Sequence, residues 1–68
     1  MNAEVLLELA REWHDIATIA ARSSASIAAT NGPMDVANEA LAIARRALAL
    51  AGRCEELARK CAEDSRRD

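Results

Sequence analysis

This 68-residue chain contains almost no aromatic residues: it has one Trp, and Phe and Tyr are absent. Helix-breaking residues are also scarce, with two Gly and one Pro. Without aromatic rings, the hydrophobic core must be thin, and the backbones that enclose it must pack closely. With so few Gly and Pro, almost nothing interrupts a helix along the chain.

The chain also lacks a strong charge of either sign. Nine basic and eleven acidic side chains give a formal charge of −2, which disfavours a phosphate-binding surface, so we expect no nucleic-acid partner. There is no basic leader with an apolar core, and no apolar run approaches the roughly 18 residues of a membrane span. Two Cys do not make a secreted disulfide framework. We therefore expect a soluble, cytoplasmic protein with reduced thiols and no membrane partner.

Alanine dominates what is present, with seventeen residues, and Leu, Arg and Glu supply much of the rest. These are the strongest helix-forming residues. The length allows a single small domain over residues 1–68, and domains of this size are marginally stable unless they are cross-linked, metal-bound or oligomeric. The composition therefore predicts an all-α domain that gains stability from outside one chain.

The segment 36–62 carries two apolar stripes with alternating spacings of four and three residues, as on one face of a helix. The first stripe consists of Val36, Ala40, Ile43, Ala47, Leu50, Cys54, Leu57 and Cys61. The second consists of Ala37, Leu41, Ala44, Leu48, Ala51, Glu55, Ala58 and Ala62. Two stripes require two neighbours, and only one of these neighbours can be the first half of the chain.

The first half has a matching pattern. Asn2 can cap a helix, because its side chain can accept a hydrogen bond from the free amides of the first turn. The main apolar stripe of this helix consists of Leu6, Leu9, Trp13, Ile16, Ala20, Ser23 and Ile27. Leu7 and Ile19 lie outside that stripe and indicate a second contact line.

A single cluster of helix breakers, residues 30–35, separates the two halves. Asn31 or Gly32 can adopt the left-handed conformation that ends a helix, Pro33 suits the first turn of the next helix, and Asp35 can accept from its free amides. So short a connection predicts an antiparallel hairpin of two long helices, over about residues 2–31 and 33–66.

A monomeric hairpin would leave several large apolar side chains in water, at roughly 1.5–3 kcal/mol of forgone burial each. We therefore predict a four-helix or larger bundle, most simply a homodimer, with a trimer or tetramer left open. The predicted hairpin core consists of Leu6, Leu9, Trp13, Ile16, Ile27, Val36, Ile43, Leu50 and Leu57. The predicted oligomer interface consists of Leu7, Ile19, Leu41, Ala44, Leu48 and Ala51.

Trp13, Gly52 and His14 are candidates for special roles. Trp13 and Gly52 would be nearly level, so Gly52 would make room for the indole; the alternatives are close contact with a second chain, or no particular role. His14 is the only imidazole, and a boundary His with one hydrogen bond is the favoured interpretation. The alternative is a small-molecule, zinc or haem site near Trp13 and His14 inside an oligomer. No HxxxH, ExxH or CxxC motif accompanies it, so we predict no metal or cofactor.

Cys54 and Cys61 lie about 10.5 Å apart along one helix, too far for a disulfide within the chain. They fit small buried positions, and the alternative is a bond between Cys54 and Cys61 of a second copy. A nucleophile pair of Cys54 with His14 would lack an oxyanion site and an orienting carboxylate. We therefore predict no catalytic residues and no enzyme activity.

Two polar segments have both a structural and a functional interpretation. The segment RSSASIAAT suits a close helix crossing, or alternatively a polar cavity or buried hydrogen-bond network formed by Ser23, Ser24, Ser26 and Thr30. The basic residues of the second half are interrupted by acidic ones, and no aromatic residue can stack on a base, which favours a solvated, salt-bridged face.

The NGPMD turn between two capped, Ala- and Leu-rich helices resembles the hairpins of computationally designed helical bundles and repeat proteins. Segment 39–64, EALAIARRALALAGRCEELARKCAED, is similar to one helix of a designed repeat unit. This resemblance implies self-assembly into a symmetric oligomer, without substrate. Two Cys, a single Lys against eight Arg, and the Ser-rich segment depart from that style. They would fit a natural four-helix-bundle regulator that binds RNA or protein.

Overall fold

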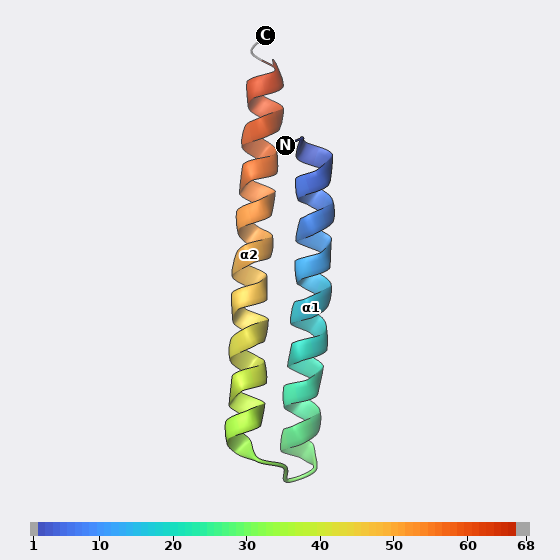
Figure 1. Ribbon diagram of the computed structural model, residues 1–68, viewed down its shortest axis with the longest axis vertical. Coiled ribbons are helices and arrows are strands. Elements are labelled where there is room, and N and C mark those ends of the chain that lie inside the picture. Colours follow the sequence, from blue (N-terminus) through green and yellow to red (C-terminus); the bar gives the residue numbers. More distant parts are fainter. Residues whose placement is uncertain (1, 67–68) are drawn as a thin grey trace.

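The chain folds as an antiparallel hairpin of two long helices, α1 (Ala3–Ala29) and α2 (Met34–Arg66) (Figure 1). This computed structural model describes residues 2–66, a range that contains no strand; Met1, Arg67 and Asp68 of the predicted 1–68 domain lie outside it. The molecule measures 57 × 14 × 13 Å. The predicted all-helical hairpin is confirmed, with helix ends within two residues of those expected.

Asn2 caps α1 as predicted. Its backbone is extended, with φ −89° and ψ 163°, and its side-chain oxygen accepts a hydrogen bond from the Val5 amide at 2.9 Å. Glu4 adds a carboxylate to the first turn, where the helix dipole favours negative charge. The sequence therefore defines the start of α1 locally.

The turn ends α1 with two nested hydrogen bonds. Asn31 adopts the left-handed conformation, with φ 55°, and its amide donates to the Ala28 carbonyl at 3.3 Å. The Gly32 amide donates to the Ile27 carbonyl at 2.8 Å, which completes a Schellman motif. The Pro33 carbonyl accepts from the Ala37 amide at 3.2 Å, so Pro33 immediately precedes α2 instead of lying within its first turn.

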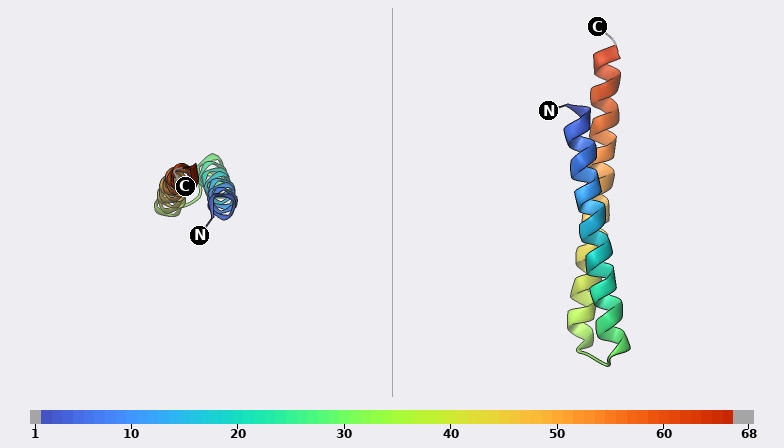
Figure 2. Two further views of the ribbon diagram at one scale, coloured as in Figure 1. Left: turned by 90° about the horizontal axis from the view of Figure 1, so that it is seen from above. Right: turned by 90° about the vertical axis from the view of Figure 1, so that its right-hand side faces the viewer.

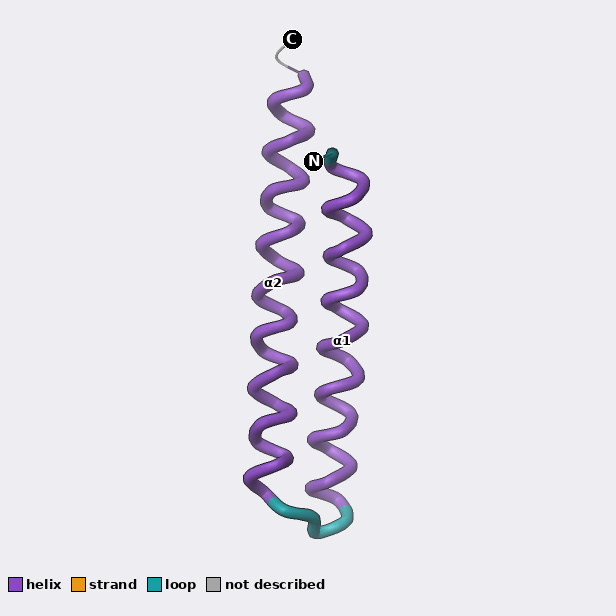
Figure 3. Tube along the Cα trace, viewed as in Figure 1, coloured by secondary structure: helices purple, strands orange, loops and turns teal. Residues whose placement is uncertain are grey.

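The two helices differ in length, with 27 residues in α1 and 33 in α2. They lie side by side in all views (Figures 2 and 3), and α2 continues past the N-terminal end of α1. The turn is at one end of the molecule, and the start of α1 and the end of α2 are at the other. The last turns of α2 therefore have no neighbour from α1.

Each helix contributes one row of residues to the contact, and spacings alternate between three and four residues, as in a heptad pattern. The α1 row consists of Ala3, Leu6, Ala10, Trp13, Ala17, Ala20, Ser24 and Ile27. The α2 row consists of Ala37, Ala40, Ala44, Ala47, Ala51, Cys54, Ala58 and Cys61. The α2 row contains only Ala and Cys, so the core is thin, and the helices can pack closely.

This contact row corrects the predicted division between core and interface. Ala44 and Ala51, predicted at the oligomer interface, are buried against α1 with 4% and 0% exposed. Four predicted core residues are instead between 41% and 52% exposed: Ile16, Val36, Ile43 and Leu50. The line along which α2 contacts α1 runs between the two predicted stripes of α2. It consists of small residues from both stripes. Of the remaining predicted core, Leu6 is buried, and Leu9, Trp13, Ile27 and Leu57 are half-buried.

The Ser-rich end of α1 makes a close helix crossing. The Ser24 hydroxyl donates to the Ala37 carbonyl of α2 at 2.8 Å, and Thr30 donates to the Ser26 carbonyl one turn back at 3.0 Å. Ser23 and Ser26 are exposed. The four hydroxyl groups therefore do not form the buried network of the alternative interpretation.

Candidate interaction surfaces

One edge of the hairpin is an apolar surface, which we call the isoleucine flank. It consists of Leu9 and Ile16 from α1 and Val36, Ile43, Leu50 and Leu57 from α2. Each residue lies one position before a contact-row residue, at seven-residue steps, so these side chains lie along one side of the contact. Ile16, Ile43 and Leu50 line a common groove together with Trp13, Arg46 and Ala47. Ile43 is 52% exposed.

A further row borders the isoleucine flank on each helix. On α1 this outer row contains Val5, Glu12, Ile19 and Ser26, and on α2 it contains Glu39, Arg46, Arg53 and Lys60. Ile19 is 64% exposed, the largest fraction among the big apolar residues of the described chain. The α1 outer row is thus apolar and acidic, whereas the α2 outer row is mainly basic.

The opposite edge, which we call the histidine flank, is less continuous. It consists of Leu7 and His14 from α1 and Met34, Leu41, Leu48 and Glu55 from α2. His14 Nε2 lies 2.9 Å from Glu55 Oε1, and about half of each side chain is exposed. This is the single hydrogen bond expected of a boundary His. Nothing in the sequence pointed to Glu55 as its partner, because a pair 41 residues apart depends on the register of the hairpin.

Trp13 and His14 lie on different sides of the hairpin. Trp13 borders the isoleucine flank, whereas His14 turns toward Glu55 on the histidine flank. Within residues 2–66, no three His, Cys, Asp or Glu side chains gather in a way that could hold a metal ion. Within one hairpin, Trp13 and His14 therefore do not face a common site.

Gly52 does not make room for the Trp13 indole, which corrects the prediction. A Cβ built on Gly52 would meet nothing within 4 Å, so this position faces open space. The reason is helical geometry: Gly52 follows Ala51, the most buried residue of α2, and is turned about 100° away from the contact. Trp13 instead lines a groove together with Ala47 and Leu50.

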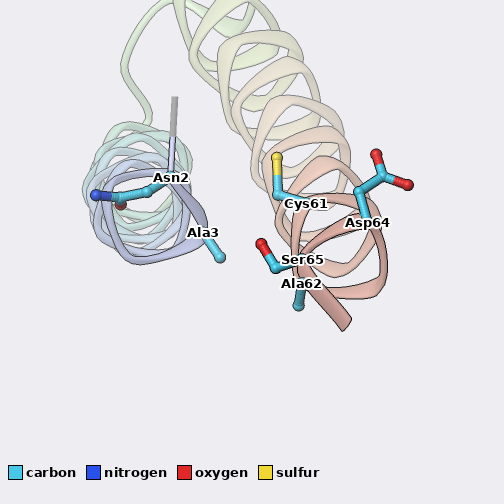
Figure 4. A pocket seen from close by; sticks show the side chains of 6 residues that line it. All are labelled: Asn2, Ala3, Cys61, Ala62, Asp64 and Ser65. Carbon is cyan, nitrogen blue, oxygen red and sulfur yellow. The ribbon is translucent and has the colours of Figure 1, made fainter. Parts of the chain in front are cut away.

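Cys54 and Cys61 are half-buried on the contact row of α2, at positions otherwise occupied by Ala. Cys61 also lines a shallow hollow at the open end of the hairpin with Asn2, Ala3, Ala62, Asp64 and Ser65 (Figure 4). The Asn2 amide and the Asp64 carboxylate point away from the hollow in different directions. The hollow thus offers no set of polar groups that converge on a ligand.

The charged side of α2 forms ion pairs within the helix. Glu56 lies 3.8 Å from Arg53 and 3.6 Å from Lys60, and all three side chains are substantially exposed. This is the salt-bridged, solvated face that the alternating charges predicted.

No helix within residues 2–66 is sufficiently long and apolar to cross a membrane. Comparisons of the chain with protein-family models, with curated proteins and with solved structures gave no match. A function must therefore be inferred from the exposed flanks of the hairpin.

Sequence reasoning missed the positions of Val5 and Met34, which are 42% and 56% exposed, and it assigned the isoleucine flank to the core. A signal was present in the sequence. Small and large residues alternate within each predicted stripe of α2, and the small members of both stripes together form one continuous row.

Proposed function

We propose that this chain is a structural, self-assembling helical-bundle protein without catalytic activity, whose partner is another copy of itself. One observation carries the proposal: among residues 2–66, ten large apolar side chains are between 37% and 64% exposed, whereas the buried residues are almost all Ala. A homodimer is the smallest closed assembly that covers one flank of each copy. A trimer or tetramer would also cover part of the second flank.

The free energy at stake is large for such a small chain. Full burial of a Val, Leu or Ile side chain is worth about 1.5–3 kcal/mol, so covering the exposed half of one gives roughly 1 kcal/mol. Ten of these residues represent on the order of 10 kcal/mol, which is comparable to the total stability of an ordinary domain. Association can therefore stabilise the hairpin substantially.

The choice of buried residues supports the same proposal. A rotation of α2 by about 50° about its axis would turn Val36, Ile43 and Leu50 toward α1 and bury more apolar surface in one chain. The hairpin instead uses Ala for the inner contact and keeps the larger residues outside. This arrangement suits a chain that meets further helices on its flanks.

The proposed role also agrees with the stylistic resemblance to designed helical hairpins, in which the assembly is itself the purpose. A reducing compartment such as the cytoplasm suits the two half-buried Cys of α2, which occupy Ala-like positions. Neither feature requires a substrate or a cofactor.

The test is the mass of the purified chain in solution, measured by light scattering coupled to size exclusion and by sedimentation equilibrium. We expect a dimer or larger oligomer at high micromolar concentration, with a melting temperature that rises with concentration. Ile43→Glu should shift the equilibrium strongly toward the monomer, because it puts a charge on the exposed apolar flank.

Ala42→Glu is the matched control, since it introduces the same charge one position away on the exposed outer side of α2. It should leave the oligomer intact. A compact, helical monomer at high micromolar concentration, with a melting temperature independent of dilution, would refute the proposed function.

A further inference from the structure

The two flanks differ in how readily a partner can cover them. The isoleucine flank contains no charged residue. This also holds when its α1 row is extended by seven residues at each end, to Asn2 and Ser23. The histidine flank carries the His14 and Glu55 pair between its leucines. Removing a half-exposed carboxylate and its imidazole partner from water is costly, so the isoleucine flank is the better contact surface.

The size of the isoleucine flank suits a second copy of the chain. With Val5 and Ile19 of the outer row, it offers eight large apolar side chains, six of which are between 41% and 64% exposed. A facing partner covers roughly 50 Å² of each such side chain, so the sixteen side chains of two facing flanks contribute on the order of 800 Å² of apolar surface. With the polar rim included, this approaches the roughly 1,200 Å² of a small specific interface.

Two symmetric arrangements can bring these flanks face to face. If the twofold axis runs along the helices, α1 of one copy packs against α2 of the other, and both turns lie at the same end. If the axis runs across the helices, each helix packs against its own equivalent, and the turns lie at opposite ends. Neighbouring helices are antiparallel in both cases, so helix packing alone does not choose between them.

The outer rows distinguish the two arrangements by charge. Glu12 of α1 is level with Arg53 of α2 in the hairpin, because the turn fixes the antiparallel register. With the axis along the helices, Glu12 faces Arg53 of the other copy. With the axis across them, the register that places Arg46 of each copy opposite Arg53 of the other also places Glu39 opposite Lys60, so the repulsion cancels the attraction and no net gain remains.

We infer, resting on the proposed self-assembly, that the isoleucine flank binds the same flank of a second copy about a twofold axis parallel to the helices. In this dimer α1 of each copy packs against α2 of the other, both turns lie at one end, and Glu12 pairs twice with Arg53 across the interface. The histidine flanks remain on the outer edges.

Charge reversal tests the pairing. Glu12→Arg and Arg53→Glu should each weaken the dimer by roughly tenfold, because each replaces two attractions at the rim by two repulsions. Mixing the two variants should restore association as a heterodimer, since positions 12 and 53 are then both basic in one chain and both acidic in the other. The variant that carries both substitutions in one chain should also recover wild-type affinity.

The matched controls are Arg22→Glu and Glu63→Arg, which reverse charges on the exposed outer sides of the two helices. They should leave the dimer unchanged. If the mixture of Glu12→Arg with Arg53→Glu associates no better than either variant alone, the pairing is wrong.

Spin-label distances test the direction of the axis. The label is placed on Ala29→Cys, next to the turn on the outer side of α1, in a background with Cys54→Ala and Cys61→Ala. The expected separation is roughly 30 Å, because neighbouring helix axes lie about 10 Å apart and the labels point outward. A dimer with a separation near the 57 Å length of the hairpin would overturn this inference and leave the proposed function standing. A monomer without a label-to-label distance would instead overturn the proposed function.

Discussion

At the scale of single residues, the two glycines have opposite roles. A Cβ on Gly32 would lie 2.8 Å from Ile27 Cγ2 and 3.1 Å from the Ile27 carbonyl oxygen, within the tight end of α1. A Cβ on Gly52 would meet nothing within 4 Å. Only Gly32 is therefore required by the space around it.

We predict that Gly32→Ala lowers the stability of the hairpin by roughly 1–2 kcal/mol, because the turn must distort to admit the methyl group. Gly52→Ala should instead raise stability by about 1 kcal/mol, the usual gain in a helix interior. Urea unfolding followed by circular dichroism measures both. Destabilisation by Gly52→Ala would show that a second chain approaches this position closely, which is the alternative considered for it from the sequence.

At the scale of the helices, the contact depends on small side chains. Ala51 has no exposed surface and lies midway along the hairpin, between Ala47 and Cys54 of the contact row. A larger residue would have to push α1 away along several turns, because the interior is closely packed.

Ala51→Leu is therefore expected to cost about 1–3 kcal/mol in thermal or urea unfolding, through overpacking. Ala42→Leu, the same substitution on the exposed outer side of α2, should change stability by less than about 0.5 kcal/mol. Equal effects of the two variants would contradict a close contact along this row.

Much of this architecture could be predicted from the sequence because its signals are local. The Asn2 cap, the left-handed residue of the turn, and the two helices follow from residues a few positions apart. The spacing of the apolar residues alone did not predict which side of α2 faces α1, although the alternation of small and large residues carried that signal. Two stripes of equal length lie about 100° apart on α2, and nothing in their spacing shows that the contact with α1 runs between them.

The hydrogen-bond partner of His14 also could not be predicted from the sequence, because it depends on the register between the two helices. Glu55 lies in a stripe that was assigned to an oligomer, yet it meets His14 within one chain at 2.9 Å. The assignments of core and interface changed for the same reason. If α2 rotates about its axis by half the angle between its two stripes, a different set of its residues is buried against α1.

At the scale of the whole molecule, the two apolar flanks lie on opposite edges of a hairpin that measures 14 × 13 Å in cross-section. A closed dimer that joins isoleucine flanks leaves both histidine flanks outside. Leu41 and Leu48, which are 37% and 50% exposed, are then available only to further copies. The histidine flank would therefore control assembly beyond the dimer.

The double variant Leu41→Glu with Leu48→Glu is expected to keep the dimer, with a dissociation constant within about twofold of wild type, and to remove any larger species seen at millimolar concentration. Sedimentation velocity over a concentration series measures both effects. The reason is geometric, because the substituted side chains project from the edge that the dimer does not cover, and four added charges per dimer repel further copies. If this variant instead dissociates to monomers while Ile43→Glu remains dimeric, the histidine flank is the primary interface and the roles of the two edges are exchanged.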